Sequence, residues 1–489
     1  MHTRSLGMPL GILISAGMLA AQSAPIPARI SERLTANGLK ADVSFLASDA
    51  LEGRGTPSRG LDVAAEYIAA QFRRAGLEPA GDDGYFQTAN FVNVIPNTGM
   101  LRLAVESGGK QIAASFDHMA LTDPAALDLA GAAAYLADPA TVDQAPAEQV
   151  RGKVLILRAA AGARARVNPA TLARLRPALI VTLTAGVAGN AGARLREAGA
   201  EATPALAVWD PEIRAVFDAA KPGPLEATVS AHIAPPESVP VKLHNVIGVL
   251  RGSDPALRDT YVLVTAHYDH LGIRGTGPGD HIYNGANDDA SGTACVIEMA
   301  QALAALPERP KRSIVFMALF GEELGLVGSR YYGRHPVFPL AKTIADLNLE
   351  QMGRTDDNSG PRVGIVNVTG YDYTSITPVL AKAGAEFDIR VMKDEQASDP
   401  FFARSDNQAL ADAGIPAHTL SVGYVFPDYH QPGDEWPKID YDNMARVDRT
   451  AALAVFRLAD SLGVPVWNEA NPKTERYVKA QKALTDSRP

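Results

Sequence analysis

Cysteine is almost absent from this sequence, because Cys295 is the only one in 489 residues. A single cysteine excludes intramolecular disulfides, so stability has to come from a packed core or from bound metal. Runs rich in lysine or arginine are also missing, and the formal net charge is -9 with a pI of about 5.6. This charge balance argues against nucleic acid or an anionic membrane as the primary partner.

Apolar residues, by contrast, are plentiful. The chain is 46% hydrophobic and 21% charged, and its mass is 51.6 kDa. A chain of this size and composition can bury a substantial core and is long enough for two or three domains. We find no internal repeat and no low-complexity tract in it.

The first residues have the layout of a secretory signal peptide. A short basic start at Arg4 precedes an apolar stretch over 6–19 and small residues over 20–24. The stretch is short and interrupted by glycine, which favours a cleaved signal over 1–24, with an uncleaved anchor as the alternative. We therefore expect an exported protein, periplasmic or secreted, with no integral membrane span after cleavage.

The rest of the chain divides into segments that differ in the spacing of their apolar residues. Apolar residues at helical spacing over 58–81 predict an amphipathic helix that ends at Gly76, within an N-terminal part of the main domain over 31–109. Short strand-like runs over 110–236 predict an inserted, strand-rich domain. Continuous apolar strands alternating with helices over 240–465 predict an α/β fold with a mostly parallel central sheet flanked by helices. The polar tail over 466–489 is expected to be peripheral.

Polar side chains follow several of the predicted strands. Because open α/β sheets place their sites at the carboxyl ends of the strands, residues far apart in the sequence can meet there. The candidates are two imidazoles and six carboxylates: His267, Asp269, Asp288, Asp289, Glu322, Glu323, Glu350 and His430. Nitrogen and oxygen ligands without a thiolate suit zinc or a similar ion.

The number of carboxylates indicates two metal ions. A single catalytic zinc needs three protein ligands and a water, which leaves a surplus here. Two ions about 3.5 to 4 Å apart would use one histidine and one carboxylate each, with a shared bridging carboxylate and a bridging water. The adjacent Glu322 and Glu323 have a simpler alternative, because an acidic pair often begins a helix.

Taken together, these motifs resemble the co-catalytic zinc aminopeptidases and glutamate carboxypeptidases of clan MH, including members with a protease-associated (PA) insert. The resemblance covers roughly 40–100, with "FLASDALEGRG" and "YIAAQFRRAGLEPAG", and 240–460, with "VTAHYDH", "NGANDDASG", "FGEELG", "NLEQMG" and "PDYHQPGDE". The insert over 110–236 is assigned as PA-like mainly from its position.

The resemblance implies a role for each matching position. His267 and Glu350 would complete one zinc site, Glu323 and His430 the other, and Asp288 would bridge them. Glu322 would be the general base, and Asp269 would orient His267. The peptide bond between Asp288 and Asp289 would be cis, as it is in similar enzymes.

The sequence departs from the family pattern at two positions. Glu350 stands where these peptidases commonly have aspartate, and Asp346 is a rival ligand on the same strand face. Asn407 stands where histidine is frequent.

Further residues near the motifs have weaker claims to a role. His270 and His281 flank the site loops, where a solvated or hydrogen-bonded imidazole is the simpler interpretation. Arg404 and Tyr424 could contact substrate, and they could equally be ordinary loop and strand residues.

The functional prediction is an exported di-zinc exopeptidase acting on peptides, in which two Zn²⁺ ions, replaceable by Co²⁺ or Mn²⁺, act with Glu322 as the general base. An aminopeptidase is expected first. The alternatives are a carboxypeptidase or dipeptidase, which would need a cationic pocket for a substrate carboxylate, and a non-catalytic receptor-like protein of the same fold. The sequence leaves the side-chain preference and the oligomeric state open.

Overall fold

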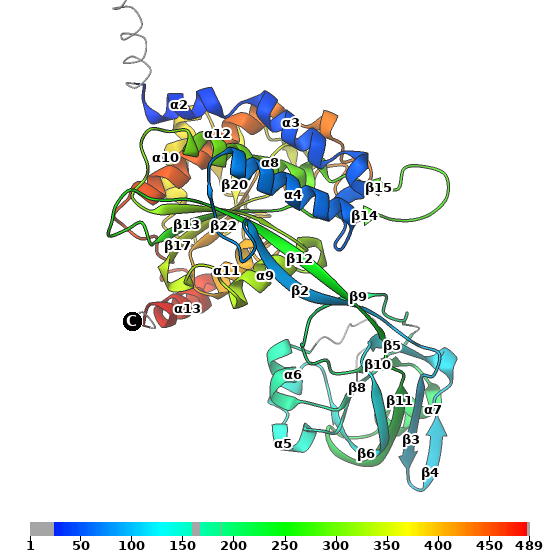
Figure 1. Ribbon diagram of the computed structural model, residues 1–489. Coiled ribbons are helices and arrows are strands. Elements are labelled where there is room, and N and C mark those ends of the chain that lie inside the picture. The colour runs from blue at the N-terminus through cyan, green and yellow to red at the C-terminus, as the bar shows by residue number, and fades with distance from the viewer. Residues whose placement is uncertain (1–23, 159–166, 187, 487–489) are drawn as a thin grey trace, which may run out of the picture. The chain divides into compact units, whose positions relative to one another are not determined.

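The computed structural model describes residues 24–158, 167–186 and 188–486 (Figure 1). Apart from its last residue, the expected signal peptide over 1–24 lies outside the described residues. The chain forms two compact units, a larger one of Met1–Ala89 and Leu243–Pro489 and a smaller one of Asn90–Lys242. None of the helices in the described ranges is long and apolar enough to cross a membrane.

A mixed sheet forms the centre of the larger unit, and its strand order is β21-β20-β22-β17-β13-β16-β12. The four strands β16, β13, β17 and β22 are parallel. β12 pairs antiparallel with β16, and β20 pairs antiparallel with β22 and parallel with β21. The mostly parallel sheet predicted from the sequence is confirmed. The strands are β12 (Glu237–Leu250), β13 (Tyr261–His267), β16 (Ser313–Leu319), β17 (Thr343–Leu349), β20 (Ile365–Val368), β21 (Arg390–Met392) and β22 (Ala417–Ser421).

Helices cover both faces of this sheet (Figure 1), which explains why β13, β16 and β17 are buried along their whole length. One face carries α2 (Ile26–Arg33), α3 (Ala36–Leu46), α4 (Arg59–Arg74), α8 (Ser291–Ala304), α10 (Thr377–Gly384) and α12 (Tyr441–Asp460). The other carries α9 (Val327–Arg334), α11 (Asn407–Asp412) and α13 (Glu475–Asp486). The predicted amphipathic helix is α4: the Ser58 side chain caps its start, and Gly76 follows its end at a φ of 74°.

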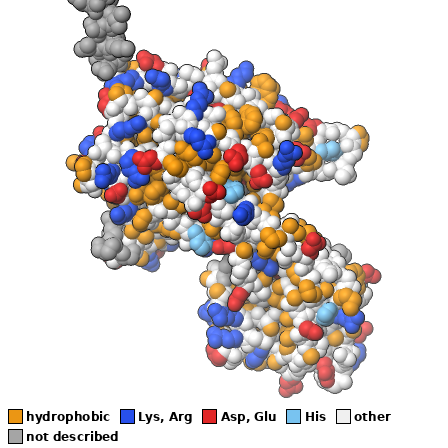
Figure 2. All heavy atoms as spheres, in the orientation of Figure 1, with side chains coloured by type: hydrophobic (Ala, Val, Ile, Leu, Met, Phe, Trp, Pro, Cys, Tyr) orange, Lys and Arg blue, Asp and Glu red, His pale blue; other side chains and the backbone are white. Residues whose placement is uncertain are grey.

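Short elements complete the larger unit. They include β1 (Glu78–Pro79), β2 (Phe86–Ile95), which continues into the smaller unit, and two hairpins, β14 (Gly272–Ile273) with β15 (Ile282–Tyr283) and β18 (Asp356–Asp357) with β19 (Gly360–Pro361). On the face drawn in Figure 2, acidic and basic side chains are interspersed over this unit.

The C-terminal segment after 465 differs from the peripheral tail expected from its polar composition. Trp467 and Tyr477 are 2% and 3% exposed and belong to one of the hydrophobic cores. Their rings stack at a centroid distance of 4.7 Å, and both also contact Phe402 edge-on. Two aromatic residues therefore anchor a segment whose other side chains are mostly exposed.

The smaller unit contains a sheet in the order β4-β3-β11-β6-β7-β8-β10-β5. Its strands are β3 (Arg102–Ser107), β4 (Lys110–Ala113), β5 (Met119–Asp123), β6 (Leu127–Ala137), β7 (Val154–Arg158), β8 (Leu179–Leu183), β10 (Ala205–Val208) and β11 (Gly223–Ile233). β9 (Arg194–Glu197) pairs with the part of β2 in this unit, and the helices are α5 (Ala147–Val150), α6 (Pro169–Leu175) and α7 (Pro211–Asp218).

The borders of the smaller unit lie outside the range 110–236 expected from the sequence. β3 pairs antiparallel with β11, and Leu101, Leu103 and Val105 belong to the core of this unit. The chain therefore enters the unit before residue 110, because a strand must stay with the partner that completes its hydrogen bonds.

Candidate metal and catalytic centre

Three adjacent parallel strands deliver most of the candidate residues. His267 is the last residue of β13, Glu350 directly follows β17, and Glu322 and Glu323 lie in a 3₁₀ turn (Glu322–Leu324) shortly after β16. Since β13 lies between β16 and β17, the carboxyl ends of the three strands meet at one edge of the sheet. The topology thus explains why residues from separate motifs share one site.

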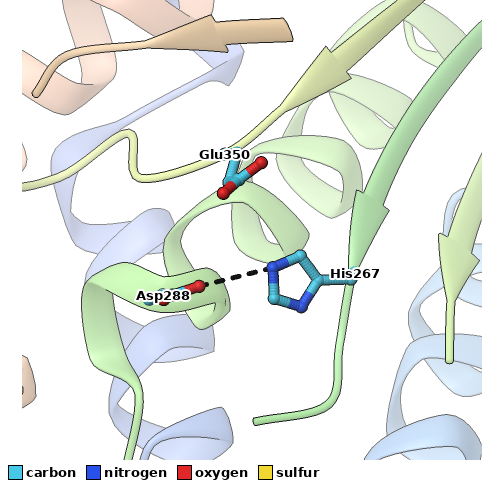
Figure 3. Close-up of side chains that lie close together, drawn as sticks. All are labelled: His267, Asp288 and Glu350. Atoms are coloured by element: carbon cyan, nitrogen blue, oxygen red, sulfur yellow. Dashed lines mark ion pairs between the residues drawn. The ribbon is translucent and has the colours of Figure 1, made fainter. Parts of the chain in front are cut away.

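The first donor group consists of His267, Asp288 and Glu350, with one ligand atom of each within 4.8 Å of the others. Nε2 of His267 lies 3.3 Å from Oδ1 of Asp288, and Figure 3 shows the imidazole directed at that carboxylate. The rival Asp346 is not in this group. It is fully buried inside β17 and accepts a hydrogen bond of 3.1 Å from the Thr265 hydroxyl.

The second donor group shares Asp288 with the first. Nε2 of His430 lies 3.1 Å from Oδ2 of Asp288 and 3.3 Å from Oε1 of Glu323. His270 also belongs here, because its Nδ1 is 2.8 Å from the same Glu323 oxygen and it forms a potential ligand group with Asp288 and Glu323. The two oxygens of Asp288 therefore face different imidazoles, His267 on one side and His430 on the other.

Several of these atoms are buried without a partner in hydrogen-bond geometry among the described residues. They are Nε2 of His267, both ring nitrogens of His270, Oε1 of Glu323 and Oε2 of Glu350. Buried polar atoms in native proteins almost always have a partner, so a cluster of unsatisfied ones indicates a missing cation. Nitrogen and oxygen donors of this kind fit zinc well.

Asp269 links the histidine loop to the acidic loop. Its Oδ1 accepts a hydrogen bond of 3.0 Å from the backbone N–H of Glu322 and lies 3.6 Å from Nδ1 of His267. Its Oδ2 accepts a hydrogen bond of 3.2 Å from the Thr56 hydroxyl. One buried carboxylate thus fixes the backbone of Glu322 relative to His267.

Asp434 holds the loop that presents Asp288. Its carboxylate accepts hydrogen bonds from the backbone N–H groups of Asn287, at 3.0 Å to each oxygen, and of Asp288, at 3.1 Å. Burial raises the pKa of Asp434 to about 6. The Asp288–Asp289 peptide bond in this loop is cis, as the resemblance implied. Sequence reasoning missed Asp434, although it lies in the same motif as His430.

Arg54 gives a physical account of the "LEGRG" segment. It is completely buried, and its guanidinium donates to the backbone oxygens of Tyr268 (2.8 Å), Asn284 (2.8 Å), Gly285 (2.9 Å) and Leu46. Burial lowers its pKa to about 10, while nearby carboxylates, Asp269 first among them, act in the opposite direction. Arg54 therefore supports both loops of the site, and its positive charge lies beside the acidic cluster.

Glu322 lines a cavity of about 330 Å³ together with Asp288, Glu323, Glu350 and His430. Burial raises the pKa of Glu322 well above its usual value. For Glu323 burial acts in the same direction, but the close imidazoles of His270 and His430 outweigh it and lower the pKa to about 2. Two adjacent carboxylates therefore have opposite environments, which an ordinary helix-opening pair would not require.

The remaining candidates lie outside the two donor groups. His281 contacts the backbone oxygen of Gly277 in an exposed loop, and Tyr424 is buried against the ring of Phe401. Asn407 is a buried structural residue, since it donates to the backbone oxygen of Phe402 and accepts from the Thr419 hydroxyl. Arg404, in contrast, lines the cavity.

Residues 245–455 match the profile of peptidase family M28. The chain is similar to this family over that segment, which lies within the larger unit. The matched M28 segment contains all of the donor residues described above.

Among curated proteins, the chain is 35% identical over 283 residues to a Leptosphaeria maculans protein named "Probable zinc metalloprotease", covering 50% of this chain and 64% of that protein. It is 29% identical over 244 residues to aminopeptidase YwaD of Bacillus subtilis, covering 48% of each. The chain thus spans about half to two thirds of the length of these relatives. An aminopeptidase structure from Aneurinibacillus sp. strain AM-1 matches with a TM-score of 0.55 and 19% identity over 91% of this chain and 97% of that one, which supports the fold.

Proposed function

We propose that the protein is an exported di-zinc exopeptidase that releases amino-terminal residues from peptides. One observation carries the proposal. Asp288 directs one oxygen at His267 and the other at His430, so two donor groups share a single carboxylate next to Glu322. Such an arrangement suits a pair of metal ions on one bridging ligand, as in other two-metal hydrolases. The names of the relatives, a zinc metalloprotease and an aminopeptidase, agree with this chemistry.

In this proposal His267 and Glu350 hold one ion, Glu323 and His430 hold the other, and Asp288 holds both. When bound, the two zinc ions would supply Lewis acidity that lowers the pKa of a water and polarises the scissile carbonyl. His270 contacts Glu323 and keeps that carboxylate in place. Buried partners of this kind commonly orient metal ligands.

Glu322 moves the proton. Its carboxylate lines the cavity beside Asp288, where it can accept a proton from the attacking water and return it to the leaving amine. Asp269 positions Glu322 through the backbone hydrogen bond of 3.0 Å and lies next to His267. The general base and one proposed metal ligand, His267, thus share Asp269 as a neighbour.

Two further proposals concern the rest of the chain. Residues 1–24 direct export, on the evidence of their charge and apolar pattern, and the smaller unit is a PA-like insert, on the evidence of its strand-rich fold and its place in the chain. A receptor-like protein without activity is disfavoured because this chain keeps a full candidate set of ligands and a base.

The decisive experiment combines metal content with one turnover assay. Purified protein loaded with zinc should contain two equivalents of the ion and should hydrolyse leucine p-nitroanilide but not its N-acetylated analogue. The Glu322→Gln variant is the matched control, because it should keep both ions and lose turnover. Saturation at one equivalent with full activity would contradict the di-zinc centre, and equal cleavage of the acetylated substrate would contradict an aminopeptidase.

A further inference from the structure

Two guanidinium groups line the cavity that contains the acidic centre. Arg330 comes from α9, shortly after the acidic turn, and Arg404 comes from the segment before α11. Both residues are exposed, and within the described ranges neither side chain makes an ion pair or a hydrogen bond, although the charge of Arg330 acts on the buried Asp406 carboxyl. The guanidinium of Arg404 lies over the Phe401 ring at 4.3 Å from its centroid, which restricts its position without neutralising its charge.

Another arginine near the site, Arg354, differs from these two because its charge is neutralised by ion pairs within the protein. Arg354 is buried and makes ion pairs of 2.6 Å with Asp356 and 2.9 Å with Asp428. Its positive charge is therefore already balanced within the protein. Arg330 and Arg404 keep their hydrogen-bond donors available to a molecule that enters the cavity.

The charge balance of the cavity points in the same direction. Four carboxylates line it, those of Asp288, Glu322, Glu323 and Glu350, and the proposed function assigns every one of them to the metals or to proton transfer. Two divalent cations would balance their formal charge. The two guanidiniums then add positive charge to the cavity, that of Arg330 partly offset by the nearby Asp406, so a substrate with a negative group would be favoured.

We propose that Arg330 and Arg404 form a carboxylate-binding subsite, and that the preferred substrates are short peptides with a carboxylate close to the scissile bond. Guanidinium groups bind carboxylates through paired N–H donors, which gives directional recognition in addition to charge. The volume of about 330 Å³ is at the small end of ligand sites and suits a short peptide. This inference rests on the proposed peptidase function and specifies its substrate class.

The carboxylate could be the free carboxyl terminus of a dipeptide or an acidic side chain. Zinc-loaded enzyme would therefore be assayed on two matched pairs, Leu-Leu against Leu-Leu-amide and Leu-Glu-amide against Leu-Gln-amide. The same pairs would be assayed with Arg330→Gln, Arg404→Gln and the double variant. Arg258→Gln is the control, because Arg258 is exposed and precedes the opposite end of β13 from His267.

Wild-type enzyme should prefer the carboxylate member of at least one pair by about tenfold in kcat/KM, mainly through KM, since a charge-assisted hydrogen bond contributes this much. A preference within the first pair identifies the free terminus, and one within the second identifies the side chain. The double variant should abolish the preference, whereas Arg258→Gln should keep it. Turnover of all four peptides without discrimination would overturn the subsite.

A binding measurement tests the carboxylate subsite independently of whether the protein hydrolyses peptides. Glutarate titrated by calorimetry into the zinc-loaded protein should bind about tenfold more weakly to the double variant than to wild type or Arg258→Gln. Equal affinities would overturn the subsite even if the peptides are cleaved. Conversely, glutarate binding that depends on both arginines, without hydrolysis of any peptide, would refute the peptidase function and keep the carboxylate site.

Discussion

The buried guanidinium of Arg54 donates a hydrogen bond of 2.9 Å to the backbone oxygen of Gly285, at the start of the loop that presents Asp288. The same side chain reaches Asn284 in that loop and Tyr268 in the histidine loop. A neutral residue at 54 would leave these oxygens unsatisfied and would remove a positive charge from among buried carboxylates. The geometry of both loops therefore depends on one residue that is neither a proposed metal ligand nor the proposed general base.

Replacement of this residue is the first prediction. Arg54→Met should lower the free energy of unfolding by about 3 to 5 kcal/mol, because it breaks a buried charged network. Urea unfolding monitored by circular dichroism would measure the change. Arg59→Met is the matched control, since Arg59 is exposed at the start of α4 and should change stability by less than about 0.5 kcal/mol. Equal free energies of unfolding for the two variants would show that the buried hydrogen bonds of Arg54 do not stabilise the fold.

The two adjacent glutamates should respond differently to the same substitution. Glu322→Gln keeps the side-chain size but cannot accept a proton, so turnover should fall by about 10² to 10⁴ while both metal ions remain bound. Glu323→Gln should weaken one metal site, with an activity loss that added zinc partly reverses. Metal analysis and steady-state kinetics on both variants test this. Loss of metal in the first variant and retention in the second would reverse the assignment.

Two imidazoles approach Glu323, and a pair of variants should separate their roles. His430 contacts both Asp288 and Glu323, so His430→Gln should lose one equivalent of zinc. His270 contacts Glu323, and His270→Gln should keep two equivalents but bind the second about 10 to 100 times more weakly, as is usual for residues that support a ligand. Competition with a chelator would measure both affinities. The opposite pattern would make His270 the ligand.

The sequence predicted that the candidate donor residues lie close together, as the structure shows, but it did not predict the residues that hold them in place. His267, Glu323 and Glu350 follow apolar strands, and the rule that parallel strands present residues at their carboxyl ends brings them together. Arg54 is 230 residues from Asn284 in the sequence, and no local sequence pattern predicts that contact. His270 lies in a loop, where side chains do not alternate regularly, so its direction could not be inferred.

The domain borders show a similar limit. Composition predicted a strand-rich insert over 110–236, but the pairing of β3 with β11 places residues before 110 in the smaller unit as well. The aromatic anchors Trp467 and Tyr477 were hidden in a polar segment, because two side chains are enough to attach a tail whose average composition is hydrophilic. Strands that pair and side chains that pack together can lie far apart in the sequence, and a single sequence does not identify which residues are partners.

A buried acidic group away from the metal centre gives the last prediction. Glu298 of α8 is 8% exposed and packs against Gly38 of α3, and burial, with the nearby Asp42 charge, raises its pKa to about 7 against the opposing effect of Arg74. In the unfolded chain this carboxyl ionises near its ordinary pKa of 4.5. Its stabilising contribution is therefore complete below pH 4.5 and is lost as the pH rises through 7.

Glu298→Gln removes this titration and keeps the shape of the side chain. The variant should match wild type at pH 4 and exceed its free energy of unfolding by about 3 to 4 kcal/mol at pH 8, since the pKa rises from 4.5 to about 7 and a difference of one in pKa corresponds to about 1.4 kcal/mol. Urea unfolding across this pH range would measure the difference, with Glu66→Gln, at an exposed position of α4, as the control. Because the metal centre is the same in all three proteins, its own pH dependence cancels in the comparison. A difference that stays constant from pH 4 to pH 8 would show that Glu298 does not titrate with a raised pKa, and that only its packing distinguishes it from glutamine.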